Sequence, residues 1–106
     1  MPRKSLFVAL LFCPLFALAS QEIVITIKDH KFLPAEVKVP SGQKVKLVID
    51  NQDATPEEFE SAELNREKTI APKSKASVWI GPLKPGRYPY MGEFNQATAQ
   101  GVIIAE

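Results

Sequence analysis

The sequence predicts an all-β fold, an antiparallel β-sandwich built from six to eight short strands. Several stretches alternate between apolar and polar residues, which is the pattern of half-buried strands. Nine prolines and five glycines fall mainly between these stretches, where they favour turns. A sustained apolar stripe with helical period is missing, so a long helix is not expected.

The first strands are predicted in residues 22–28, 36–40 and 44–50, each of which alternates in character. Pro34 and Pro40 confine the second of these strands to a short edge position, since proline cannot donate to a central ladder. A turn that contains glycine joins the second and third strands. The residues expected to face the core from the first strand are Ile23, Ile25 and Ile27.

The middle of the chain begins with a turn over residues 51–56, which are rich in Asn, Asp, Thr and Pro. A loop follows in which Phe59 is the expected apolar anchor among three carboxylates. Residues 62–68 are predicted to form a short helical turn and no more, because they carry no continuous apolar face. Ile70 is expected to begin the return into the sheet.

The last strands are predicted in residues 74–80, 87–91 and 101–105, with a turn rich in proline over 82–86. In the first of these, alternation places Trp79 on the outward face or at a sheet edge. An exposed tryptophan can mark a partner site, but single surface aromatics are also common.

The first nineteen residues have the features of a secretory signal peptide. Arg3 and Lys4 are followed by an apolar run over 6–18 and by small residues at 17 and 19. The run is shorter than the roughly 20 residues that a membrane-spanning helix needs. We therefore expect cleavage after Ala19 and an exported domain of residues 20–106.

Composition restricts the function classes. Thirteen basic and twelve acidic residues give a formal charge of +1, with 45% hydrophobic and 24% charged residues. This balance suits one globular domain and disfavours binding to nucleic acid or to an anionic membrane. The single cysteine, Cys13, lies in the predicted signal peptide, so the exported domain is expected to have neither disulfides nor thiolate ligands.

The order of these elements resembles a cupredoxin-like domain over essentially the whole exported chain. The resemblance implies a Greek-key β-sandwich of about seven short strands, with a metal site between loops at one end. The segments that carry it are Lys31-Phe32-Leu33-Pro34-Ala35-Glu36, Val39-Pro40-Ser41-Gly42, Val48-Ile49-Asp50-Asn51, residues 83–90 and Gly101-Val102-Ile103-Ile104.

The same resemblance implies that the usual ligands of a type 1 blue-copper site are replaced. Alignment with the family on Phe59, Tyr88, Tyr90 and Gly101 gives the occupants of the ligand slots. The two histidine slots hold Glu57 and Asn95, the cysteine slot holds Gly92, and Ala99 lies near the methionine slot. Copper–thiolate bonding creates a blue site. We therefore expect this domain to have no type 1 copper site.

Residues 55–61, 64–68 and 91–101 look like those of a divergent group of periplasmic cupredoxin-like proteins. Members of that group are associated with bacterial iron and copper uptake, beside iron permeases and a periplasmic metal-binding partner. In its last loop the group typically has a histidine where this chain has Asn95. The resemblance implies a periplasmic location and a partner of one of these two kinds.

Carboxylates on two loops are the candidate metal ligands. Glu57, Glu58 and Glu60 lie on one predicted loop and Glu93 on another, and the implied fold brings these loops to one end. A thioether beside carboxylates can hold copper or ferrous iron weakly. The predicted metal-site residues are Glu57, Glu58, Met91, Glu93 and the single histidine, His30. The alternative is a solvated acidic face, with Met91 in the core and Glu93 paired with Arg66 or Lys68.

The predicted function is therefore a periplasmic accessory of metal uptake that binds copper or iron. Catalytic motifs are missing from the sequence: it has no Ser-His-Asp set, no nucleophilic cysteine in the exported part and no phosphate-binding glycine loop. Two alternatives stay open. One is a metal-free interaction domain that uses Trp79 or the acidic loop, and the other is a ferrous iron oxidase component.

Overall fold

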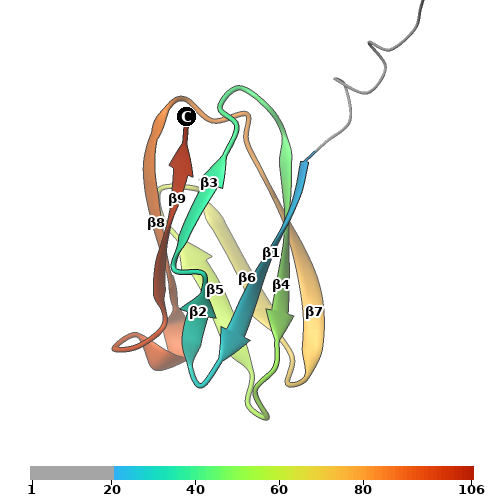
Figure 1. Cartoon of the computed structure of the whole chain (residues 1–106). Coiled ribbons are helices and arrows are strands. Elements are labelled where there is room, and N and C mark those ends of the chain that lie inside the picture. The colour runs from blue at the N-terminus through green and yellow to red at the C-terminus, as the bar shows by residue number, and fades with distance from the viewer. Residues whose placement is uncertain (1–20) are drawn as a thin grey trace, which may run out of the picture.

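A computed structural model describes residues 21–106, and these form two β-sheets packed face to face (Figure 1). The predicted signal peptide, residues 1–19, lies outside the described residues. The elements are β1 (Gln21–Lys28), β2 (Lys31–Leu33), β3 (Glu36–Val39), β4 (Val45–Asn51), β5 (Glu57–Ser61), β6 (Arg66–Ile70), β7 (Ser74–Ile80), β8 (Gly86–Gly92), the 3-10 helix η2 (Glu93–Asn95) and β9 (Gln100–Ala105).

One sheet has four strands in the order β2-β1-β4-β7, and the other has five in the order β3-β9-β8-β5-β6. Most neighbours are antiparallel, as predicted, but β1 pairs with β4 and β3 pairs with β9 in parallel. These parallel pairs arise because the chain crosses between the sheets after β2 and again after β3. The predicted all-β sandwich is therefore confirmed, and the prediction that all its strands are antiparallel was wrong.

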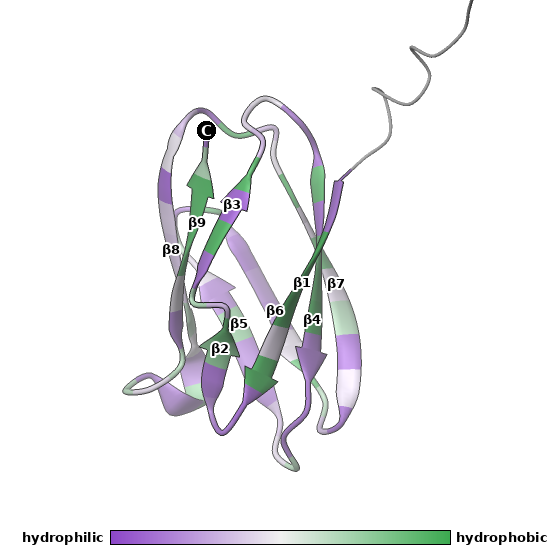
Figure 2. Ribbon diagram, in the orientation of Figure 1, coloured by the Kyte–Doolittle hydropathy of each residue, from purple (hydrophilic) through white to green (hydrophobic). Residues whose placement is uncertain are grey.

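The core lies between the sheets and follows the alternation predicted from the sequence. Along β1 and β4 the buried positions are apolar up to Ile27 and Ile49, and the outward positions between them are mixed, with Val24 and Val48 among charged and polar residues. Figure 2 shows both strands in its colours of hydropathy. Tyr90 lies at the centre of an aromatic cluster, with ring centroids 4.9 Å from those of both Phe32 and Phe59. Burial of each such ring contributes roughly 1.5–3 kcal/mol to stability.

Two predictions for the middle of the chain were wrong. The segment 57–61 was expected to be a loop, but it is strand β5, paired on one side with β6 and on the other with β8. Residues 62–68 were expected to form a short helical turn, but only residues 62–65 form a turn, in which the Asn65 N–H donates to the Ala62 carbonyl (3.1 Å), and residues 66–68 belong to β6. The Ser61 hydroxyl donates to the Pro89 carbonyl (2.7 Å) and accepts from the Leu64 N–H (3.0 Å), which fixes a tight turn that leads into β6.

The strands β2, β5 and β6 were not predicted, so the structure has nine strands where about seven were expected. Strand β2 has three residues, and four of the five residues of β6 are exposed. β2 is too short for its alternation to be recognised in the sequence, and β6 shows no alternation. Within residues 21–106 the structure has no helix long and apolar enough to cross a membrane.

Candidate metal centre

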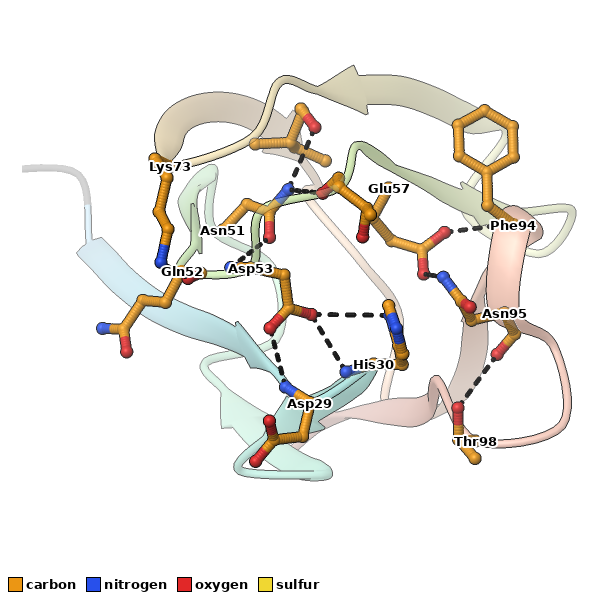
Figure 3. Close-up of polar contacts among 12 residues, drawn as sticks. Asp29, His30, Asn51, Gln52, Asp53, Glu57, Lys73, Phe94, Asn95 and Thr98 are labelled. Atoms are coloured by element: carbon orange, nitrogen blue, oxygen red, sulfur yellow. Dashed lines mark hydrogen bonds and ion pairs between the residues drawn. The ribbon is translucent and has the colours of Figure 1, made fainter.

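The loops at one end of the sandwich are tied together by Asp53. Asp29 and His30 form the two-residue turn between β1 and β2, and both have positive φ, 54° and 60°. Such a turn normally favours glycine or asparagine. Here the Asp53 carboxylate accepts hydrogen bonds from the backbone N–H of Asp29 (2.8 Å) and of His30 (2.9 Å), as Figure 3 shows.

The pKa of Asp53 reflects this arrangement. Partial burial pushes the pKa up, but the hydrogen bonds from the N–H groups of His30 and Asp29 outweigh burial, so the pKa lies below its ordinary value. The His30 imidazole is half-exposed, with Nδ1 3.6 Å from Asp53 Oδ2. The single histidine thus lies against Asp53 and packs in the β1–β2 turn.

Asn51 organises the loop that leads to β5. Its side chain is buried, and its Nδ2 donates to the carbonyls of Thr55 (2.9 Å), Ile70 (3.2 Å) and Ala71 (3.2 Å). Its Oδ1 accepts from the Asp53 N–H at 3.0 Å. The start of β5 is therefore fixed relative to the ends of β4 and β6.

Glu57, at the start of β5, is a buried carboxylate with a relative exposure of 1%. Its Oε1 accepts from the backbone N–H of Glu58 and of Phe94, both at 2.9 Å. Its Oε2 accepts from Asn95 Nδ2 at 2.8 Å. Three N–H donors thus satisfy a charge that would otherwise be costly to bury, and they join β5 to η2 (Figure 3).

Gly92 and Ala99 complete this buried corner. A Cβ atom added at Gly92 would lie 2.5 Å from Glu57 Cδ and 2.7 Å from Ala99 Cβ, so only glycine fits. The Gly92 N–H donates to the Ala99 carbonyl at 2.8 Å. The four positions that the resemblance assigned to metal-ligand slots therefore lie together. Their side chains offer one carboxylate and one amide, with neither thiolate nor imidazole.

A second group of carboxylates lies on the outer face of the five-stranded sheet. One carboxylate oxygen each from Glu58, Glu60 and Glu93 lie within 4.8 Å of one another, and all three residues are half-buried. Glu67 on β6 is directly opposite Glu60 in the register. Among residues 21–106, no ion pair within 4.0 Å neutralises these side chains.

This crowding of like charges changes the pKa values. The hydrogen bond with Glu93, followed by burial and by repulsion from Glu93, Glu67 and Glu58, raises the pKa of Glu60 to about 7. Burial, with repulsion from Glu67, Glu93 and Glu57, also raises the pKa of Glu58. A bound cation would relieve this repulsion.

Met91 lies on the same outer face. Met91 and Glu60 are register partners on β8 and β5, so their side chains point to the same side of the sheet. Both residues line a surface hollow of about 320 Å³. The thioether is therefore beside Glu60 on the outer face, so Met91 is not core filler.

The structure divides the predicted metal-site residues into three places. Glu58 and Glu93 come together, with Met91 on the same face. Glu57 faces inward, because neighbouring residues of a strand point to opposite sides, so its predicted grouping with Glu58 on one loop was wrong. His30 lies against Asp53.

Glu60 belongs with Glu58 and Glu93 but was left out of the predicted site. Its position two residues after Glu58 would have placed both on one face, had residues 57–61 been read as a strand. The alternative pairing of Glu93 with Arg66 or Lys68 is not found in the described part of the chain. Arg66 instead donates to the carbonyls of Trp79 and Asn65.

Comparison with known protein families gives a direct match. The model of the cupredoxin-like domain family matches residues 4–105 of the chain. A curated relative, the uncharacterized protein RP394 of Rickettsia prowazekii (strain Madrid E), is 53% identical over 83 residues. That alignment spans 78% of this chain and 66% of the relative, so the chain covers slightly less than two thirds of it.

Solved structures agree on the fold. The metal binding domain of the Cu(I) exporting P-type ATPase CopA of Streptococcus pneumoniae D39, determined with Cu(I), superposes with a TM-score of 0.71 at 14% identity, over 80% of this chain and 84% of that one. Auracyanin A, a "blue" copper protein of Chloroflexus aurantiacus, also gives 0.71, at 15% identity, over 83% of this chain and 100% of its own. At these identities the likeness establishes the fold alone.

Proposed function

Because the chain belongs to the cupredoxin-like domain family, we propose that it binds a copper or iron ion through surface carboxylates, as a periplasmic accessory of metal uptake. The observation that carries this proposal is the convergence of Glu58, Glu60 and Glu93, whose carboxylate oxygens lie within 4.8 Å of one another. Among the described residues these groups have no cationic partner, so a metal ion is the simplest source of the missing positive charge.

The donor set determines which ions suit the site. Carboxylate oxygens favour iron and manganese, whereas the thioether of Met91 favours cuprous ion. The structural neighbours named above are copper proteins by their titles, which supports copper as one candidate. When bound, a redox-active ion would supply electron transfer. The residues of this chain would hold it and balance its charge.

We also propose that the domain has no type 1 copper site. The four corresponding positions hold Glu57, Gly92, Asn95 and Ala99, which cannot provide the thiolate and imidazoles of such a site. The space is occupied as well, since Glu57 hydrogen-bonds Asn95 and even one methyl group at Gly92 would collide with it.

The location and the partner belong to the same proposal. The pattern of residues 1–19 supports export to the periplasm. The resemblance to proteins of iron and copper uptake supports an iron permease or a periplasmic metal-binding protein as the partner. In this view the domain supplies or receives the ion at the outer face of the five-stranded sheet.

The experiment is an anaerobic titration of residues 20–106 with Cu(I), Cu(II) and Fe(II), comparing the parent with the Glu58→Gln/Glu93→Gln double variant. We expect saturable binding at micromolar concentrations, weakened at least about tenfold in the double variant, which corresponds to a loss of about 1.4 kcal/mol. The matched control is Glu22→Gln/Glu36→Gln, which removes two exposed charges away from this site, one on β1 and one on β3. Absence of binding, or equal binding by both double variants, would contradict the proposal.

A further inference from the structure

The outer face of the four-stranded sheet carries exposed apolar side chains. Of the four large hydrophobic residues that are most exposed among residues 21–106, three lie there: Val24 (51%), Leu33 (48%) and Trp79 (42%). They point outward because the alternate positions of β1, β2 and β7 are buried. Apolar side chains that gather on one face indicate a contact surface more strongly than scattered ones do.

The strand register joins these residues into one diagonal stripe. Val24 is directly opposite Val48, and Val48 is opposite Ser77, two residues from Trp79. On the other side, Leu33 is opposite Thr26, which is two residues from Val24. Residues on such diagonals lie within reach of each other's side chains. The stripe Leu33-Val24-Val48-Trp79 therefore runs across all four strands, and we call it the apolar stripe.

Lysines border the apolar stripe. Lys44 Nζ and Lys46 Nζ lie 5.5 and 6.0 Å from the centroid of the Trp79 ring, in cation–π contact. Five lysines belong to this face, against the two carboxylates of Glu22 and Asp50. Only one of the five has a carboxylate within 4.0 Å among residues 21–106, through the pair Lys46–Glu22 at 3.4 Å. The lysines are Lys28, Lys31, Lys44, Lys46 and Lys75.

We propose that this face docks a partner protein whose surface has an apolar centre and a rim of carboxylates. The charge of the face selects the partner, because unpaired lysines around an apolar centre are complementary to an acidic rim. Trp79 is the expected anchor, since a tryptophan covered by a partner is a frequent source of binding energy. The face lies on the opposite side of the sandwich from Glu58, Glu60 and Glu93, so partner and metal ion would bind independently.

Two other occupants fit this face less well. A second copy packed on the same face would bring lysines against lysines. A lipid bilayer would have to bury Glu22 and Asp50, which lie on the same outward sheet face as Val24 and Val48. An acidic protein surface avoids both costs.

The test is site-specific photo-cross-linking in the cells that naturally make the protein, using the full chain with Val24→p-benzoylphenylalanine. Mass spectrometry identifies the product, and the identified protein is then purified and titrated with the unlabelled domain. We expect Trp79→Ser and Lys44→Glu/Lys46→Glu each to weaken binding at least about tenfold, and added salt to weaken binding by the parent. Phe94→Ser is the control for partner binding, because Phe94 is also an exposed aromatic residue (53%) but lies on η2.

Melting temperatures establish that the variants fold. The metal affinity of Trp79→Ser and of Lys44→Glu/Lys46→Glu should equal that of the parent, which separates this test from that of the metal site. Cross-linking to a second copy, to lipid or to no protein overturns the proposal. The proposal is also overturned if the purified partner binds the Trp79→Ser variant as tightly as it binds the parent.

Discussion

Adjacent glutamates on β5 have opposite environments. Glu57 faces inward and is satisfied by three N–H donors, whereas Glu58 and Glu60 face outward and meet Glu93. The period of two along a strand produces this separation from a run of similar residues. The inward carboxylate fixes η2, and η2 carries Glu93, so Glu57 has a positioning role for the outer carboxylates.

The outer carboxylates should make stability depend on pH. Because the folded-state pKa of Glu60 is raised from 4.5 to about 7, its contribution is favourable below about pH 4.5 and is lost as pH rises through about 7. We expect Glu60→Gln, which cannot ionise, to raise the melting temperature relative to the parent more at pH 8 than at pH 5. Glu36→Gln is the control. Parallel melting profiles of Glu60→Gln and the parent would contradict this prediction.

Asp53 should contribute to stability in the opposite pH range. Asp53→Ala removes the acceptor of two backbone N–H groups in a turn with positive φ, and we expect a loss of about 2 kcal/mol in the free energy of unfolding near pH 7. Since the pKa of Asp53 is lowered, this difference should shrink as pH falls below the ordinary value of 3.8. Denaturant titrations of the parent, Asp53→Ala and Asp53→Asn measure it. A difference that does not change between pH 7 and pH 3 would be inconsistent with an ionised acceptor.

At the scale of elements, the sequence pattern was sufficient where the buried positions of a strand carry apolar residues. β1, β4 and β7 were predicted within one residue at each end, because apolar and polar residues alternate along them. β5 and β6 could not be predicted, since β5 reads as an acidic loop and β6 is mostly exposed. The place of β5 beside β8 comes from long-range contacts, including the hydrogen bond from the Ser61 hydroxyl to the Pro89 carbonyl, that no local pattern encodes.

The junction between β8 and η2 should be sensitive to one methyl group. Gly92→Ala would place a Cβ against the Glu57 carboxylate and Ala99, and we expect a loss of about 1–3 kcal/mol in stability. By displacing Glu57 it should also release η2 and weaken metal binding. Gly42→Ala is the matched control: that glycine has φ +75° with open space around it, so substitution should lower stability without changing metal affinity. If a folded Gly92→Ala variant binds the metal with unchanged affinity, the proposed positioning role of Glu57 is contradicted.

At the scale of the whole molecule, the sandwich separates two kinds of surface. The five-stranded sheet carries the carboxylates, and the four-stranded sheet carries the apolar stripe and its lysines. The near-neutral net charge conceals this division, so composition alone could not predict it. The resemblance did predict which four positions meet at the loop end, but which carboxylates face outward depended on the strand assignment.

Metal binding should stabilise the whole domain and depend on pH. An ion at a hundred times its Kd is expected to add about 2.7 kcal/mol to the free energy of unfolding. Because a proton on Glu60 competes with the ion and its pKa is about 7, affinity should rise between pH 5.5 and pH 8. Thermal melts with and without Cu(II) or Fe(II) at both pH values measure this, with Glu58→Gln/Glu93→Gln as the control. Equal stabilisation of parent and control would contradict it.

The position of the ion is the most direct test of a carboxylate site in this fold. Crystals of residues 20–106 soaked with copper or iron, measured at the absorption edge of the metal, locate the ion by anomalous scattering. We expect one ion on the outer face of the five-stranded sheet, bound by oxygens of Glu58, Glu60 and Glu93. An ion held instead at the loop end by Glu57, Asn95 or His30, or no ordered ion, would contradict this account.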